Sequence, residues 1–141
     1  MSRIYWDSML FIYWLEDNPV FAKRVGAVHA RMLERKDELV TSAFTLGEVL
    51  AGAYRKGAAA SGGEVRGLLL SLTSELVPFT AETADHYARI RGSCGLASPD
   101  AIHLACAAQA RTDLFLTNDE NLVGKVIPGI QFIAGLDSNI L

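Results

Sequence analysis

Four acidic residues lie where strand-like segments end or in the early part of helix-like segments: Asp7, Glu48, Asp100 and Asp119. Asp7 follows the apolar segment 4–6, and Asp119 closes the segment 114–118. If these segments are parallel strands of one sheet, both acids emerge at its carboxyl edge, where open α/β sheets bind ligands. Grouped carboxylates repel each other unless a cation joins them, and Mg²⁺ or Mn²⁺ prefers carboxylate oxygen and water. Such a metal centre is a common means of phosphodiester hydrolysis.

Two of these acids also have a purely structural interpretation at the ends of strands. Asp7 could be the N-cap of a helix over 8–15, a position where Asp is strongly favoured. Asp119 could cap a short helix over 120–123, and the adjacent Glu120 could take over its role. The functional interpretation is a metal ligand on the rigid end of a strand, which fixes an oxygen atom precisely.

The other two acids lie on helices. Glu48 shares a helix face with small or partly apolar neighbours, although a solvated Glu is the ordinary alternative. Asp100 follows Ser98 as a candidate N-cap and Pro99 at the first helical position, which is a good helix start in itself. The rest of that helix is nearly all apolar and therefore expected to be buried, so an acid at its mouth indicates a cleft. The four acids together favour a functional site at one edge.

The composition is that of one folded domain. The chain has 141 residues, of which half are hydrophobic and 21% are charged, so a packed core is expected and disorder is not. We expect residues 1–141 to form a single domain, since domains cluster at roughly 100–150 residues. The net charge of −3 is a weak argument against a dedicated nucleic-acid binder, which usually carries a basic excess. Clustered acids that hold metal ions contribute to that sum.

The cellular compartment is indicated by two features. Cys94 and Cys106 form neither a zinc signature nor a disulfide framework, which fits a reducing cytoplasm, and Cys106 lies in an apolar run where burial is expected. The N-terminus enters a strand-like segment without the layout of a signal peptide, and no apolar stretch approaches the roughly 20 residues that span a bilayer. We therefore expect a cytoplasmic protein without a membrane segment.

Apolar periodicity and capping residues predict an alternation of strands and helices. Strands are expected at 4–6, 39–41, 76–79, 113–117 and 130–133. Helices are expected at 8–15, 19–36, 43–55, 64–73, 81–91, 98–110 and 120–123, with a loose connection at 56–63 and a turn at 92–97. Pro78 indicates an edge position or a strand end for the third strand. This alternation favours a parallel sheet covered on both faces, an α/β fold.

The chain resembles the PIN-domain ribonucleases over essentially its whole length. The resemblance rests on Asp7 after the first strand, Glu48 in a Thr-x-x-Glu helix, and the segments 98–105 (Ser-Pro-Asp-Ala-Ile-His-Leu-Ala) and 117–119 (Thr-Asn-Asp). Its length and motif spelling are most similar to the VapC toxins of bacterial and archaeal toxin–antitoxin pairs. The resemblance implies a three-layer α/β/α, PIN-like fold with a five-stranded parallel sheet in the order 3-2-1-4-5, in which the strands before Asp7 and Asp119 are neighbours.

The resemblance also implies an activity and partners. Asp7, Glu48, Asp100 and Asp119 would bind one or two Mg²⁺ or Mn²⁺ ions and serve as the catalytic acids of a metal-dependent endoribonuclease that hydrolyses RNA with a metal-activated water. Residues that support the catalytic acids in this family are matched less specifically by Ser8, Thr45, Thr117 and Asn118. A homodimer is expected, together with a small antitoxin that lays a helix in an apolar groove between the early helices and inserts a basic side chain toward the acids.

Three further features lie near the predicted site. His103 shares a helix face with Asp100, and we interpret it as a histidine packed beside the site rather than as a ligand. Arg55 and Lys56 follow the Glu48 helix and are the best candidates for phosphate contacts. Aromatic residues are dense at the N-terminus: those not in the core are expected at an oligomer interface.

Other functions fit the residues less well. The principal alternative is a non-catalytic module with the same fold that binds RNA or protein, and the presence of all four acids argues against it. A phospho-acceptor receiver domain needs adjacent acids after the first strand and a Lys after a late strand, but Asp7 precedes Ser8 and Lys125 is poorly placed. A metal-dependent phosphatase would need an Asp-x-Asp pair that is missing here.

Overall fold

A computed structural model describes residues 1–57, 62–138 and 141. A five-stranded sheet runs through it in the order β3-β2-β1-β4-β5, and all neighbouring strands are parallel. The strands are β1 (Arg3–Trp6), β2 (Glu38–Ser42), β3 (Glu75–Val77), β4 (Leu114–Thr117) and β5 (Phe132–Gly135). The predicted α/β class and strand order are therefore confirmed, and β3 lies at an edge, as Pro78 indicated.

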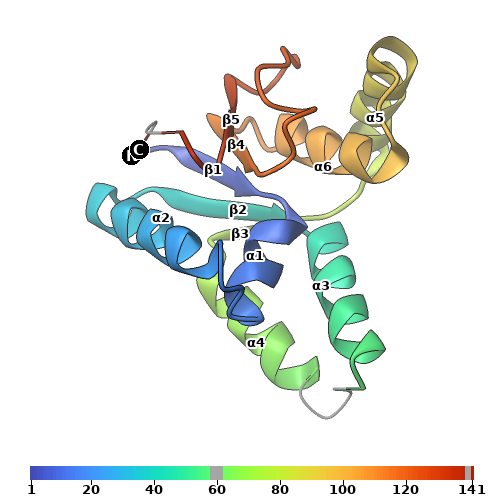
Figure 1. Cartoon of the computed structure of the whole chain (residues 1–141). Helices are drawn as coiled ribbons and strands as arrows, with labels where there is room; N and C mark the ends of the chain where they lie inside the picture. The colour runs from blue at the N-terminus through green and yellow to red at the C-terminus, as the bar shows by residue number, and fades with distance from the viewer. Residues whose placement is uncertain (58–61, 139–140) are drawn as a thin grey trace.

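Helices cover both faces of this sheet (Figure 1). The helices are α1 (Ser8–Leu15), α2 (Ala22–Arg35), α3 (Ala43–Arg55), α4 (Gly62–Leu72), α5 (Ala81–Cys94) and α6 (Ser98–Gln109). The pair α5 and α6 packs on one face, while α1, α2 and α4 lie on the other, and α3 leaves the carboxyl end of β2 to pack against α4. No helix in the described part of the chain is long and apolar enough to cross a membrane.

The two central strands show why the core has two halves. Side chains alternate between the faces of a strand, so Tyr5 belongs to the apolar cluster under α5 and α6, whereas Ile4 and Trp6 belong to the cluster under α1 and α2. All three are fully buried. Tyr5 stacks on Phe115 of β4 at a ring-centroid distance of 5.1 Å. The strand order reverses between β1 and β4, which is the topological switch point where open sheets bind ligands.

Most predicted elements are confirmed, and three are wrong in detail. Residues 120–123 form turns, not a helix, and Asp119 accepts a hydrogen bond from the Asn121 amide there (2.9 Å). The last strand begins two residues later than predicted, at Phe132. Helix α5 continues through 92–94, expected as a turn, and ends at Gly95 in the left-handed conformation.

Two further boundaries differ from the prediction. Helix α2 begins at Ala22 rather than at Pro19, because the Asn18 side chain accepts the amides of Val20 and Phe21 in a preceding turn. Ser98 is not the N-cap of α6: that position is Ala97, and the Ser98 hydroxyl lies 2.8 Å from the Tyr87 hydroxyl. The loose connection expected at 56–63 lies partly outside the described residues.

Gly129 combines a left-handed backbone with a close approach to α6. Its φ is +96°, and an added Cβ would lie 3.0 Å from the Ala108 carbonyl oxygen. We expect Gly129→Ala to lower the free energy of unfolding by about 1–3 kcal/mol. Gly124 is the matched control because its φ is +81° but nothing lies within 4 Å of the added Cβ. Urea unfolding of both variants checks this, and equal losses would show that the contact with α6 costs nothing.

Candidate active site

Three of the predicted acids line one cleft at the carboxyl end of the sheet. Asp7, Glu48 and Asp100 share this cleft with Arg55 and His103. They come from three elements: Asp7 follows β1, Glu48 and Arg55 lie on α3, and Asp100 and His103 lie on α6. Asp119 follows β4 and is not among the residues that line the cleft, but it lies close enough to Asp100 to affect its ionisation.

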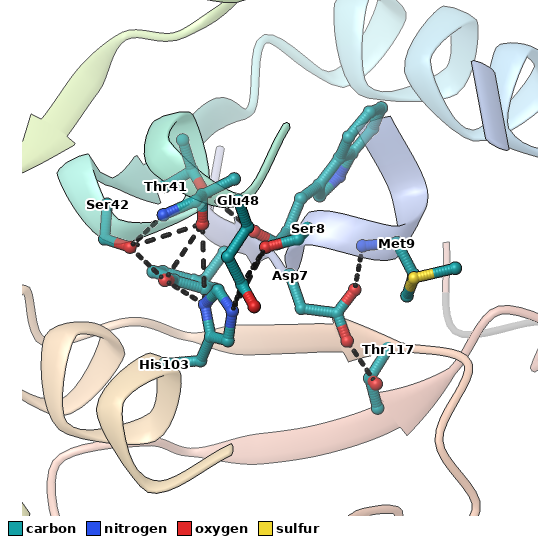
Figure 2. Close-up of polar contacts among 11 residues, drawn as sticks. Asp7, Ser8, Met9, Thr41, Ser42, Glu48, His103 and Thr117 are labelled. Carbon is teal, nitrogen blue, oxygen red and sulfur yellow. Dashed lines mark hydrogen bonds and ion pairs between the residues drawn. The ribbon is translucent and has the colours of Figure 1, made fainter. Parts of the chain in front are cut away.

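Asp7 is fixed by the strand before it and the helix after it. It is the N-cap of α1, and its side chain accepts a hydrogen bond from the Met9 amide (3.1 Å), so the predicted capping role is confirmed. The Thr117 hydroxyl at the end of β4 donates to the other carboxylate oxygen (2.5 Å), as Figure 2 shows. Burial raises the pKa of the Asp7 carboxyl above its usual range, and the hydrogen bond from Thr117 only partly offsets this.

Glu48 is tied to two neighbours on other elements. Its Oε1 atom lies 2.6 Å from Nε2 of His103 and accepts a short hydrogen bond from the Ser8 hydroxyl. Burial alone would raise the pKa of Glu48, but the hydrogen bonds from His103 and Ser8 outweigh it and hold this pKa below the usual range. Glu48 is therefore a carboxylate at neutral pH, with one oxygen bound inside the protein.

His103 is buried and bound on both ring nitrogens. Its Nδ1 atom lies 2.8 Å from the Tyr5 hydroxyl, and its Nε2 atom lies 2.6 Å from Glu48 and 3.1 Å from Ser8 (Figure 2). The expectation of a histidine packed beside the acids is confirmed. The sequence did not reveal its partners, because the contact with Tyr5 joins residues 98 positions apart.

Ser8, His103 and Glu48 do not form a hydrolase triad. In such a triad the hydroxyl and the acid lie on opposite nitrogens of the imidazole, so that the acid orients the base toward the nucleophile. Here both Ser8 and Glu48 contact Nε2, and Nδ1 faces the Tyr5 hydroxyl. The cleft is therefore not arranged for nucleophilic attack by serine.

The surroundings of Asp100 disfavour the ionised form of its carboxyl group. Burial and then the nearby charge of Asp119 raise the pKa of the Asp100 carboxyl above its usual range, with a further contribution from Glu48, while His103 opposes them. No hydrogen bond to its carboxylate is present among the described residues. Asp119, by contrast, is held in a turn in which its own amide donates to Thr117 (3.1 Å). Glu120, the alternative to Asp119, is exposed and lines a separate depression beside Asn118.

Comparison with protein-family models matches residues 4–125 to the PIN domain. The chain belongs to the PIN-domain family. A search of curated proteins finds no match. Among solved structures, this PIN domain is similar to a chain of VapBC2 from Rickettsia felis bound to a promoter DNA fragment, with 15% identity, a TM-score of 0.75 and 94% and 98% of the two chains covered.

Two other solved structures share the fold. A toxin–antitoxin complex from Klebsiella pneumoniae contains a chain with 22% identity and a TM-score of 0.65, covering 90% of this chain and 94% of that one. VapBC-5 from Mycobacterium tuberculosis contains a chain with 19% identity and a TM-score of 0.58, covering 95% and 99%. At such identities these likenesses concern the fold of the PIN domain.

The donor chemistry of the PIN-domain cleft fits a hard divalent ion. Carboxylate oxygens are the ligands that Mg²⁺ and Mn²⁺ prefer. Burial and the charges of Asp119 and Glu48 raise the pKa of the Asp100 carboxyl, and a cation bound among these acids would oppose that rise. Within the described residues, however, no three acidic, histidine or cysteine side chains converge into a ready coordination set. Asp100, which has no hydrogen-bond partner there, is the acid best able to turn toward the others.

The structure distinguishes the two basic residues predicted to contact phosphate, Arg55 and Lys56. Arg55 lines the acidic cleft, and its guanidinium folds back along α3 to within 3.9 Å of the position that a Cβ on Gly52 would take. It forms no ion pair with an acid among the described residues. Lys56 instead forms an ion pair with Glu16 of α1 (2.6 Å). Arg55 is therefore the cation available to a ligand in the cleft.

Proposed function

We propose that residues 1–141 act as one domain, a metal-dependent endoribonuclease that is the toxin of a toxin–antitoxin pair and acts in the cytoplasm. The observation that carries this proposal is the cleft at the carboxyl edge, which is lined by Asp7, Glu48, Asp100 and the guanidinium of Arg55. Membership of the PIN-domain family and the fold shared with chains of toxin–antitoxin complexes support it.

In this proposal the four acids hold one or two Mg²⁺ or Mn²⁺ ions: Asp7, Glu48, Asp100 and Asp119. A bound ion of this kind polarises a phosphodiester and lowers the pKa of water beside it. Thr117 and Ser8 keep the carboxylates of Asp7 and Glu48 in place through the hydrogen bonds described above. Asn118 donates to the Tyr13 hydroxyl (3.2 Å), and no hydrogen bond joins its side chain to the four acids among the described residues.

Arg55 is the residue proposed to bind a phosphate of the RNA. A guanidinium matches phosphate geometry and stays charged at any physiological pH. Its place beside the carboxylates lets it balance the negative charge of the backbone in a cleft that would otherwise repel RNA. The overall charge of −3 therefore does not exclude an RNA substrate.

We expect Arg55→Ala to weaken RNA binding about tenfold, because one charge-assisted hydrogen bond contributes roughly 1.5–3 kcal/mol. The loss should be similar for RNAs of different sequence, and the salt dependence of binding should become shallower by about one counterion. Fluorescence anisotropy with a labelled RNA in EDTA, across a range of salt concentrations, measures both.

Lys56→Ala is the matched control, since Lys56 is the next residue but is already paired with Glu16. It should bind RNA nearly as well as the wild type. Equal losses for Arg55→Ala and Lys56→Ala would mean that only the general positive charge of this helix end matters, and the assignment of Arg55 would be wrong.

The antitoxin partner is proposed to occupy an apolar groove between α1, α3 and α4. The groove is lined by Ile12, Leu15, Glu16, Val49, Ala53, Lys56 and Val65. Its walls are mostly aliphatic, and the pair formed by Glu16 and Lys56 lies in its lining. An amphipathic helix buries its apolar face in a groove of this kind. The acidic cleft contains Ile12 as well, so the two sites are adjacent.

A homodimer is part of the same proposal. Of the aromatic residues near the N-terminus, Tyr5, Trp6 and Phe11 are buried in the core, whereas Tyr13 and Trp14 are half-buried. Aromatic side chains that remain accessible are enriched at subunit interfaces. Light scattering on the purified protein tests this part alone, and a monomer at micromolar concentration would remove it without affecting the nuclease.

The proposed activity is tested by incubating the purified, antitoxin-free protein with total cellular RNA in Mg²⁺, in Mn²⁺ and in EDTA. Discrete fragments that need a divalent metal are expected, and sequencing their ends would identify the RNA that is cut. A folded protein that binds RNA but cleaves it in neither metal would favour the alternative, a non-catalytic PIN-fold module that binds RNA or protein.

A further inference from the structure

A chain of buried polar side chains runs from the centre of the sheet to Glu48. The Tyr5 hydroxyl donates to the Ser42 hydroxyl (2.8 Å) and lies 2.8 Å from Nδ1 of His103, and Nε2 of His103 lies 2.6 Å from Glu48. Figure 2 shows the contact between His103 and the Glu48 carboxylate. Buried polar groups of this kind cost free energy unless all of them are paired. Their position directly behind Glu48, a residue that lines the cleft, suggests that they support this side chain.

We propose that His103 is a positioning residue that fixes the Glu48 carboxylate for metal binding. His103 and Ser8 hold the Oε1 atom of Glu48, whereas Oε2 has no hydrogen bond to the described residues and is the atom assigned to the ion. This inference rests on the proposed function, since it assigns a role to His103 in the metal site proposed above. It assigns no metal–nitrogen bond to His103, because both of its ring nitrogens already face protein atoms.

The need for such a support follows from the Glu side chain. Glu48 has three rotatable bonds, and its side chain is one-third exposed, whereas that of His103 is only 6% exposed. An unsupported Glu at a cleft would sample several rotamers, and ordering it would cost free energy at the moment an ion binds. Carboxylates that ligate metals are commonly held by hydrogen bonds from a surrounding layer of residues, whose loss weakens metal affinity.

His103 itself is held rigidly from several sides. The Phe44 ring approaches it edge-on at 5.1 Å and the Tyr5 ring at 5.9 Å, both measured between ring centroids. Thr45 lies 3.4 Å from Nδ1. Tyr5 is fully buried on the central strand β1 and stacked on Phe115. The position of Glu48 is thereby tied to the central strand β1 through two hydrogen-bonding contacts, Tyr5 to His103 and His103 to Glu48.

The alternative to positioning is competition between His103 and the metal ion for the Glu48 carboxylate. In that case a carboxylate turned toward the histidine is turned away from the ion. Positioning and competition predict opposite changes when the histidine contact is lost. If His103 positions Glu48, removing the histidine contact weakens metal binding. If His103 competes with the metal, removing the contact tightens metal binding.

Tyr5→Phe is the most informative variant, because it removes only the hydroxyl that faces Nδ1 and keeps the stacked ring. Tyr87→Phe is its control, since it breaks a contact of the same length between a tyrosine and Ser98 that does not involve Glu48. His103→Ala removes the support completely, and His103→Gln keeps an amide that can donate to Glu48. The readout is Mn²⁺ affinity by isothermal titration, with melting temperatures in EDTA to establish that each variant is folded.

His103→Ala should bind Mn²⁺ about tenfold more weakly, the lower end of the effect of supporting residues in metal sites. Tyr5→Phe should show a smaller loss, His103→Gln should recover part of the affinity, and Tyr87→Phe should match the wild type. In cleavage assays at saturating RNA, extra Mn²⁺ should restore much of the kcat of Tyr5→Phe, which a general loss of packing would not allow.

Two results would overturn the proposal. If Tyr5→Phe and His103→Gln are folded and bind Mn²⁺ as tightly as the wild type or more tightly, His103 does not support Glu48. Asp100→Asn shows whether the metal site itself is correct. If the wild type binds Mn²⁺ and Asp100→Asn does not, the metal site stands and only the role of His103 is wrong. If the wild type binds no Mn²⁺ at all, both the metal site and the role of His103 are wrong.

Discussion

Asp100→Asn is expected to lower the rate of RNA cleavage by at least about a hundredfold, since the loss of a mere supporting residue in a metal site already costs roughly 10–100-fold. The substitution keeps the shape of the side chain and removes one of the charges that would hold the ion. Because Asp100 has no hydrogen-bond partner among the described residues, little native structure depends on its charge. Initial rates on a fluorogenic RNA measure the effect.

The same variant should be at least as stable as the wild type without metal. Burial and the charges of Asp119 and Glu48 raise the pKa of Asp100, so its ionised form is unfavourable in the folded protein at neutral pH. Melting temperatures in EDTA test this. Asp85→Asn, at an exposed position of α5, is the control and should cleave RNA normally. A wild-type rate for Asp100→Asn would show that the assigned acids do not catalyse the reaction.

The second large effect is expected in the groove proposed for the antitoxin. Ala53→Arg places a long charged side chain in the apolar lining between α1, α3 and α4, where a partner helix would have to pack. Burying an unpaired charge in such an interface costs several kcal/mol, which is enough to lower affinity by a factor of about a thousand or more. Co-expression with the partner and co-purification measure it, and the free variant should still cleave RNA.

Ala84→Arg is the control for the antitoxin prediction, because it makes the same change at an exposed position of α5 outside the groove. It should co-purify with the partner as the wild type does. If Ala53→Arg also remains fully bound and neutralised, the partner does not use this groove. That result would leave the nuclease assignment unaffected.

The fold was largely predictable because its signals are local. Asp7, Ser42 and Thr80 each cap the helix that follows them, as their sequence positions indicate. The errors arise where tertiary contacts override such signals. The apolar Ile130 looks like the start of a strand, but it is a buried residue between a turn at 128–129 and β5. Gly135, a weak strand former, instead completes the pairing with Thr117.

The residue types of the candidate site could be predicted from the sequence, whereas the hydrogen bonds and ion pairs among them could not. The four acids could be proposed from the sequence because three of them, Asp7, Asp100 and Asp119, lie at recognisable ends of strands or starts of helices. The role of His103 could not be inferred, because its partners Tyr5 and Glu48 lie 98 and 55 residues away in the sequence. Arg55 and Lys56 look equivalent in the sequence, and only the ion pair between Lys56 and Glu16 distinguishes them.

The central claim is that this PIN domain hydrolyses RNA with water activated at its cluster of carboxylates. Cleavage of a defined RNA in ¹⁸O-labelled water with Mn²⁺ tests it directly, by mass spectrometry of the fragment ends. Hydrolysis by water should place ¹⁸O in a terminal phosphate, and EDTA or Asp100→Asn should abolish the products. Unlabelled 2′,3′-cyclic phosphate ends that form equally well in EDTA would mean that the ribose 2′-hydroxyl is the nucleophile, and would contradict the account.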